Sequence, residues 1–297
     1  MKPGAVLNVG SGTLRHSDLD TLTRSMTDAF ERQGVELPVA HTDGPNLLPT
    51  IQSMMQHRDP ILVGGGDGSI AAAAAGLCGT GHCLGILPFG TMNLVARDLN
   101  LPPWTEDIVP KLVRGHVREI DVASVNGEVF LHSVVLGTFP QLSQTREELR
   151  DATTPWRWPT FLQAVTRELL AGETVEYRVE TRKKGLTVPT RSLMICNNKI
   201  VDAPKFGLSR ARLDRGRLYV YLPRDETPLE TAGTLARFLT GLWNGNPRLR
   251  RIKTKRARIG AEQPEILASV DGEVRAFTSP LDFNIERRAL KVWVPAP

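Results

Sequence analysis

The chain has 297 residues, more than one typical domain, and its 41% hydrophobic and 23% charged residues exclude extended disorder. Neither an apolar run of about eighteen residues nor an N-terminal signal pattern occurs, so we expect a cytoplasmic protein. Three cysteines suit a reducing compartment and predict no disulfide framework.

Residues 1 to about 122 alternate between strands and helices. Strands are expected at residues 5–9, 35–40, 61–63 and 84–87, and helices at residues 18–33, 46–57, 69–78 and 93–98. This alternation predicts a mostly parallel sheet with helices on both faces, and it places ligands at the carboxyl ends of the strands.

From about residue 117 the pattern changes to paired strands. Asn126-Gly127 separates residues 117–125 from residues 129–136 and is the strongest short signal for a hairpin. Further strands are expected at residues 174–182, 186–196, 218–222, 266–270 and 281–295, and helices at residues 160–170 and 228–242. We therefore predict an α/β plus all-β fold, with a Rossmann-like, three-layer α/β nucleotide domain at residues 1–122 and a β-sandwich domain at residues 123–297.

Two glycine-rich segments follow expected strands of the first domain. Residues 64–68 carry four glycines ahead of an alanine-rich helix, and Gly90-Thr91 follows the strand at residues 84–87. Bare backbone N–H groups at a helix N-terminus hold phosphate oxygens well, so the two loops predict a polyphosphate site. A carboxylate among such amides is unfavourable unless it binds a metal or handles a proton, so Asp67 indicates chemistry.

Other glycine-rich motifs are excluded by their spacing. A dinucleotide fingerprint requires a third glycine where this chain has Ala71, and a Walker loop requires a Gly-Lys-Ser or Gly-Lys-Thr sequence that does not occur. A tight turn without a ligand stays the alternative for the first loop taken alone.

Four segments carry a family resemblance: GGDGS at residues 65–69, PFGTMNLVAR at residues 88–97, NVGSG at residues 8–12 and VDGE at residues 270–273. In that order they resemble the GGDGT, PxGTxNDxAR, NPxSG and DGE motifs of the diacylglycerol kinase catalytic domain. Sphingosine kinases, bacterial lipid kinases and, more distantly, NAD kinases share this domain. The motifs follow the family's order along nearly the whole chain. Any one of them alone is a weak signal, but the four together are specific for this family.

The resemblance implies an ATP-dependent kinase of a lipid or lipid-like hydroxyl, such as that of diacylglycerol, with the active site in the cleft between two domains. Asp67 would engage the phosphates through nucleotide-bound Mg²⁺. Glu273, presented by the Asp271-Gly272 turn, is the candidate general base, and an ordinary hairpin turn with a solvated Glu is the alternative. The family's nucleotide contacts fall on Asn8, Ser11, Gly12, Thr42, Gly65, Gly66, Asp67, Gly68, Ser69, Gly90, Thr91 and Asn93.

Several positions depart from the family pattern. Ser69 replaces a threonine and keeps the hydroxyl group. Ala71 and Ala72 replace an Asn-Glu pair, and Leu94 replaces an aspartate, so each loses a polar group. Arg215 replaces an aspartate that binds an accessory magnesium ion in some bacterial members, and we predict that this accessory site is absent.

Two other functions stay open. NAD phosphorylation is disfavoured because NAD kinases follow the glycine-rich block with an Asn-Glu pair, and this chain has Asn93-Leu94. A catalytically silent nucleotide or lipid sensor on the kinase fold is motivated by the same departures.

The net charge of +5 is unevenly placed, because residues 248–258 read RLRRIKTKRAR. Such a segment can attract an anionic membrane surface or nucleic acid. A solvated strand is favoured, because the charges fall on both faces and no aromatic residues interleave for base stacking. The expected partner is thus a lipid or lipid-like acceptor and not nucleic acid, while peripheral contact with the anionic inner face of the membrane and a homodimer are compatible with the sequence.

Overall fold

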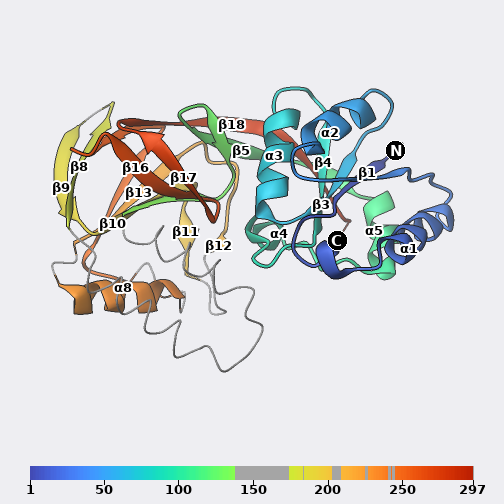
Figure 1. The fold of residues 1–297 in the computed structure, drawn as a ribbon, viewed down its shortest axis with the longest axis horizontal. Helices are drawn as coiled ribbons and strands as arrows, with labels where there is room; N and C mark the ends of the chain where they lie inside the picture. Colours follow the sequence, from blue (N-terminus) through green and yellow to red (C-terminus); the bar gives the residue numbers. More distant parts are fainter. Residues whose placement is uncertain are drawn as a thin grey trace. The chain divides into compact units, whose positions relative to one another are not determined.

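The computed structural model describes residues 1–137, 174–182, 184–202, 209–224, 227–239, 242 and 245–296 (Figure 1). It divides into two compact units, Met1–Val122 with Glu286–Pro297, and Ala123–Ile285. The chain passes from one unit to the other within two strands, β5 (His116–Val125) and β18 (Leu281–Val294). Within the described ranges, no helix combines the length and apolar character needed to cross a bilayer.

The first unit is built on a parallel sheet. Its strand order is β2-β1-β3-β4-β18, and the carboxyl-terminal part of β18 pairs in parallel with β4, with Trp293 opposite Gly85. The other strands are β1 (Gly4–Asn8), β2 (Val39–Thr42), β3 (Ile61–Gly65) and β4 (Cys83–Pro88). The helices are α1 (Leu19–Glu31), α2 (Leu47–Met55), α3 (Asp67–Leu77), α4 (Leu94–Asp98) and α5 (Val109–Val113), with short 3-10 turns at Leu14–His16 and Glu106–Ile108.

Helices cover both faces of this sheet, as Figure 1 shows, with α2 and α3 on one side and α1 and α5 on the other. On the α1 side, Leu7 and Leu62 of the sheet are fully buried in one cluster with Phe30 of α1. Helix α1 begins where Asp18 accepts hydrogen bonds from the backbone N–H groups of Asp20 and Thr21, which satisfies two amide groups of its first turn.

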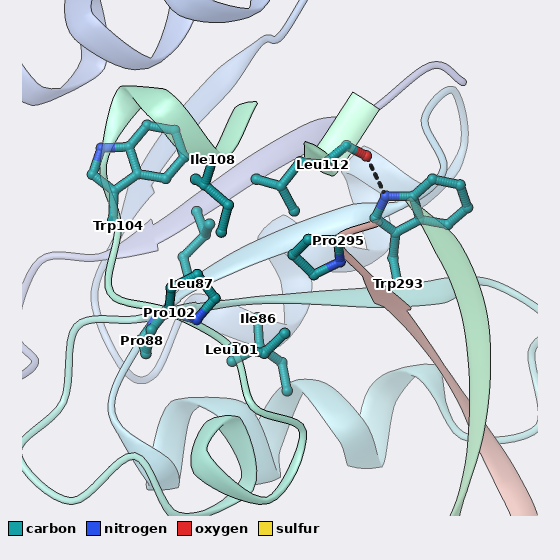
Figure 2. Close-up of a pocket in the computed structure, with 10 residues that line it drawn as sticks. All are labelled: Ile86, Leu87, Pro88, Leu101, Pro102, Trp104, Ile108, Leu112, Trp293 and Pro295. Carbon is teal, nitrogen blue, oxygen red and sulfur yellow. Dashed lines mark hydrogen bonds between the residues drawn. The ribbon is translucent and has the colours of Figure 1, made fainter. Parts of the chain in front are cut away.

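The C-terminal strand is anchored in the first unit by Trp293. The indole Nε1 donates a hydrogen bond to the Leu112 carbonyl oxygen at 2.8 Å (Figure 2). The ring lines a small apolar pocket together with Trp104, Ile108 and Pro295. The lining offers hydrophobic surface and no convergent polar side chains, so it is a packing defect of the core and not a candidate site.

The second unit consists of antiparallel sheets around a shared apolar core. One sheet has the order β14-β13-β10-β7-β16-β17, and a second contains β9, β8, β15 and the first part of β18, with the β5–β6 hairpin joined through β5. Phe130 and Phe283 meet edge to face in the core at a centroid distance of 6.3 Å. The strands are β6 (Glu128–Phe130), β7 (Ser133–Gly137), β8 (Val175–Thr181), β9 (Gly185–Thr190), β10 (Ser192–Asn197), β13 (Leu218–Pro223), β14 (Leu249–Thr254), β15 (Arg256–Gly260), β16 (Glu265–Val270) and β17 (Glu273–Thr278), with a small β11–β12 pair (Ile200–Val201, Ser209–Arg210) and helix α8 (Pro228–Leu239).

The predicted fold class is confirmed: an α/β unit with a parallel sheet is followed by an antiparallel, β-rich unit. Two expected strands are each divided between sheets, because residues 129–136 form β6 and β7, and residues 186–196 form β9 and β10. The helix expected at residues 160–170 lies outside the described residues. The expected second domain ran to residue 297, whereas Glu286–Pro297 join the first unit through the pairing of β18 with β4.

Candidate functional site

The carboxyl ends of β3 and β4 lie side by side, because Gly65 pairs with Pro88 in the parallel register. Strand β3 runs through Gly66 directly into α3. Gly66 is the N-cap of this helix and carries no side chain, so no side-chain hydrogen bond caps the first turn. The amide groups at this helix N-terminus are therefore available for an anion such as a phosphate oxygen.

The loop after β4 approaches this helix start backbone to backbone. A Cβ atom added at Gly90 would lie 2.5 Å from the Gly66 Cα and 2.7 Å from the Asn93 Oδ1, so only glycine fits. Asn93 adopts φ +49° and folds its side chain back onto the loop. Its Oδ1 accepts the Gly90 N–H at 2.9 Å, and its Nδ2 donates to the Gly90 carbonyl at 2.8 Å.

Asp67 links the two helix starts. Its Oδ1 accepts a hydrogen bond from the Leu94 backbone N–H at 2.7 Å, where Leu94 is the first residue of α4. Leu94 thus contributes a backbone group, so the loss of the family's aspartate side chain leaves this link intact. The carboxylate stands in the first turn of α3, where the helix dipole favours a negative charge.

The loop after β1 packs against the other two. Asn8 is buried, and its Nδ2 donates to the Ser69 Oγ at 2.8 Å while its Oδ1 accepts the Gly10 N–H at 3.2 Å. Gly12 adopts φ +43°, and a Cβ atom there would lie only 2.1 Å from the Phe89 carbonyl oxygen. These contacts hold three consecutive strand ends of the sheet in one compact arrangement of loops.

The remaining candidates of the first unit lie at the margins of this arrangement. Thr42 is opposite Asn8 in the β1–β2 register, but it is buried and its hydroxyl donates to the Asp43 carbonyl at 3.3 Å. Thr91 is exposed in the loop beside Gly90. The candidates that the three loops bring together are Asn8, Ser11, Gly12, Gly65, Gly66, Asp67, Gly68, Ser69, Gly90 and Asn93.

A magnesium ion fits Asp67 only as part of a nucleotide complex. Among the residues that the structure describes, no three His, Cys, Asp or Glu side chains gather in a metal-binding group. Mg²⁺ commonly takes one or two carboxylate oxygens together with substrate phosphates and water, so one carboxylate beside a phosphate loop suits it.

The predicted hairpin turn before Glu273 is present and is anchored by Asp271. Asp271 has φ +48° and Gly272 φ +100°, and Val270 pairs with Glu273 across the turn. The Asp271 carboxylate accepts three consecutive backbone N–H groups, of Leu131, His132 and Ser133, at 2.7, 2.9 and 2.8 Å.

Burial dominates the electrostatics of Asp271. It raises the pKa of the Asp271 carboxyl above its usual value, and the three amide donors and the nearby Arg210 guanidinium oppose that rise. The Arg210 Nη1 donates to the Leu131 and Asn197 carbonyl oxygens, and Asn197 also donates to the Leu131 carbonyl at 3.1 Å. The turn is thus fixed to the start of β7 by a buried polar network.

Glu273 itself is exposed and belongs to an ion pair that the sequence reasoning missed. Its Oε2 accepts from the Arg275 Nη2 at 2.8 Å, and the Arg275 Nη1 also pairs with the Glu128 Oε1. The Glu-x-Arg spacing on one strand is a signal that could have indicated the first pair, because alternate residues share a face. Glu128 lies far away in the sequence and gives no such signal.

Asp214, the neighbour of Arg215, is bound by an arginine side chain. Asp214 is bound by Arg212 through two hydrogen bonds, Nε to Oδ1 at 3.0 Å and Nη2 to Oδ2 at 2.9 Å. A guanidinium that binds both oxygens of a carboxylate competes directly with a cation for them.

The comparisons with known proteins agree with this geometry. Residues 4–125 match the model of the diacylglycerol kinase catalytic domain. A "Diacylglycerol kinase" of Staphylococcus saprophyticus is 26% identical over 150 residues, which are 48% of this chain and 49% of that protein. The Yersinia pestis protein "Probable lipid kinase YegS-like" is 39% identical over 83 residues, 27% of this chain and 28% of that protein. The alignments thus cover half or less of these relatives.

Solved structures share the fold over nearly the whole length. A diacylglycerol kinase from Bacillus anthracis str. Sterne has a TM-score of 0.68 at 19% identity, covering 98% of this chain and 96% of that chain. A second structure from the same organism has a TM-score of 0.75 at 22% identity with the same coverage. Residues 4–125 of the chain are therefore similar to the diacylglycerol kinase catalytic domain.

Proposed function

We propose that the protein is an ATP-dependent kinase that transfers the γ-phosphoryl group to a hydroxyl of a lipid or lipid-like acceptor, with Mg²⁺ bound as the nucleotide complex. The observation that carries the proposal is the close approach of two glycine loops, in which Gly90 lies against Gly66. They meet at the start of α3, which has no side-chain cap and carries Asp67 in its first turn. The match of residues 4–125 to the model of the diacylglycerol kinase catalytic domain supports the same reaction class.

The three loops of the first unit are assigned to the nucleotide. Amide groups at the start of α3 and in the loop after β4 bind phosphate oxygens, and Asn8 and Ser69 support them through their mutual hydrogen bond. Asp67 engages the phosphates through the magnesium ion. Phosphoryl transfer depends mainly on positioning and on neutralising charge, so this assignment gives the loops most of the catalytic task.

Glu273 is assigned as the general base. The acceptor oxygen forms a bond to the γ-phosphorus, its proton moves to the Glu273 carboxylate, and the bond from the γ-phosphorus to the bridging oxygen breaks as ADP leaves. The rigid Asp271-Gly272 turn supports this assignment, because a base must be held in one place to collect a proton.

A lipid acceptor is supported by two observations outside the loops. The relatives named above are called diacylglycerol and lipid kinases. Strand β14 presents Arg251 and Lys253 to solvent at the edge of its sheet, which suits peripheral contact with an anionic membrane.

A catalytically silent nucleotide- or lipid-binding protein is the second candidate. The Arg212–Asp214 pair favours this second candidate, because Arg212 occupies the carboxylate beside Arg215, where some bacterial relatives bind an accessory magnesium ion. The two candidates differ in one property, which is turnover.

Incubation with labelled ATP, Mg²⁺ and a panel of diacylglycerol, sphingoid base and mixed lipid extract separates the candidates. The proposal predicts one phosphorylated lipid product, and a fall of about 10²- to 10⁴-fold in its rate for Glu273→Gln with ATP affinity nearly unchanged. The matched control is Glu265→Gln, an exposed glutamate at the other end of the same hairpin. Binding of ATP without any lipid product would favour the silent protein.

A further inference from the structure

Arg275 bridges two carboxylates that come from different sheets of the second unit. Its Nη2 contacts the Glu273 Oε2 at 2.8 Å, and its Nη1 contacts the Glu128 Oε1. Each carboxylate thus occupies a separate nitrogen of one planar guanidinium. The arrangement fixes the guanidinium by its two ends, which a single surface ion pair does not do.

The positions of the three residues follow from the strands that carry them. Glu273 and Arg275 are two residues apart on β17 and so project from the same face. That face carries Phe277, which packs on the core between the sheets, while Glu128 belongs to β6 of the other sheet. The bridge therefore spans the two sheets at the end of the sandwich where the Asp271 turn lies.

We propose that Arg275 is a positioning residue for Glu273, holding its carboxylate in one orientation, while Glu128 holds the guanidinium in place. The inference rests on the proposed role of Glu273 as the general base. A cation beside a carboxylate favours the charged form, which is the form that accepts a proton. Hydrogen bonding to Glu273 in turn raises the pKa of Arg275 above its usual value.

The residues of β16 that pair with Glu273 and Arg275 carry no charge. Opposite it on β16 is the apolar Val270, and Arg275 is opposite Ala268. On the turn, the Asp271 carboxylate is directed at the amides of residues 131–133 and is near Arg210. Arg275 and Glu128 are therefore the two side chains to replace in a test of the positioning role.

Opposite shifts are expected from the two neighbours of Glu273. Arg275→Gln removes the cation, so the acidic limb of the pH–rate profile should move to higher pH, by up to about one unit for an exposed pair. Glu128→Gln removes the competing anion and leaves Arg275 to Glu273 alone, so the limb should move to lower pH. Arg275→Gln should also lower kcat about ten- to a hundredfold with the KM for ATP unchanged, and Arg275→Lys should restore part of it.

The measurement uses the full chain and two readouts. The pH–rate profile with the lipid acceptor gives the acidic limb, and carboxyl ¹³C NMR gives the titration midpoint of Glu273, identified by the resonance missing in Glu273→Gln. Arg258→Gln is the control, because it removes one exposed arginine from β15 in the same unit. Thermal unfolding of each variant separates a loss of fold from a loss of positioning.

The outcomes distinguish this inference from the assignment of the base. Unchanged NMR midpoints, or shifts of the same sign in Arg275→Gln and Glu128→Gln, would overturn the positioning role even if Glu273→Gln is inactive. Shifted midpoints with an unmoved acidic limb would overturn its part in turnover. Normal turnover in Glu273→Gln would instead remove Glu273 as the base, whatever the midpoints show.

Discussion

Single glycines decide whether the loops after β3 and β4 can meet. Gly90 and Gly66 approach so closely that a methyl group at position 90 would lie 2.5 Å from the neighbouring backbone, which cannot move as a side-chain tip can. We expect Gly90→Ala to separate the loops, so that the Kd for ATP rises at least tenfold while the second unit stays folded. Isothermal titration with ATP and magnesium measures this, and Gly185→Ala, at a position with open space and no positive φ, controls for the loss of a glycine. Equal ATP affinity in the two variants would contradict the assignment of these loops.

Asp271 is the residue on which the Glu273 turn depends for its position. Asp271→Ala leaves three buried N–H groups without their acceptor, and each such group costs about 1–3 kcal/mol when unsatisfied. We expect the free energy of unfolding to fall by about 3 kcal/mol or more, measured by urea titration. A loss below about 1 kcal/mol would mean that water replaces the carboxylate and that the turn does not need it.

Among single residues, the sequence predicted the positions of the glycine loops better than the contacts of the carboxylates. Strand, glycine and helix follow one another along the chain, so a phosphate loop can be inferred from neighbours alone. Asp271 binds amides about 140 residues away in the chain, and Arg275 pairs with Glu128 across two sheets. Contacts of this kind depend on the folded sandwich and leave no local pattern.

Among the elements, those with a strong local signal were predicted well. The hairpin at Asn126-Gly127 has the positive φ angles, +49° and +86°, that its sequence requires. Helix α1 was predicted at residues 18–33 from its apolar spacing, and it extends over Leu19–Glu31. The strand expected at residues 35–40 begins instead at Val39, just after Pro38, which has no backbone N–H to donate to a sheet.

The basic segment 248–258 was expected as one strand, but it forms two. Strand β14 ends at Thr254, and β15 begins at Arg256 in a different sheet. On β14, Ile252 packs on the core while Arg251 and Lys253 are exposed, and Arg250 is half-buried on the same face as Ile252. The charged residues of this segment thus lie on two strands of different sheets. The sequence pattern does not show where the chain leaves one sheet for the other.

This geometry gives the membrane proposal a specific test. Replacing Arg251 and Lys253 with glutamine should weaken binding to vesicles of phosphatidylcholine with anionic phosphatidylglycerol, by up to about thirtyfold at low salt for two basic residues. The matched control replaces Arg24 and Lys111, two exposed cations of the first unit, with glutamine. Binding that is insensitive to salt, or equal for neutral and anionic vesicles, would leave β14 as a solvated edge strand.

For the molecule as a whole, the main difference from the sequence-based prediction is the path of the C-terminus. The alternating pattern of residues 281–295 indicates a strand but not its partners, and β18 pairs with β15 in one unit and with β4 in the other. Long-range pairing of this kind has no counterpart in local propensity. The two units therefore share a strand at the C-terminus as well as the β5 connection.

This path predicts that the C-terminal strand stabilises the first unit. Trp293→Ala removes an indole that packs beside Leu112 and donates a hydrogen bond to its carbonyl. A fully buried Trp→Ala change costs about 3–5 kcal/mol, and because Trp293 is half-buried we expect about 2–3 kcal/mol. Urea unfolding measures the loss, and bound ATP with magnesium should offset part of it. A variant as stable as the parent chain would show that the strand is dispensable for this unit.

The central claim is the proposal that the protein transfers phosphate from ATP to a lipid while Asp67 engages the nucleotide phosphates through magnesium, and one rate tests it most directly. The rate of labelled phospholipid formation from ATP is compared between the parent chain, Asp67→Asn and Asp28→Asn, an equivalent change on the exposed face of α1. The asparagine at position 67 can still accept the Leu94 N–H bond, so the fold should survive while the rate falls at least about 10²-fold. A parent chain that forms no lipid product, or an Asp67→Asn variant that forms it at the parent rate, would contradict the account.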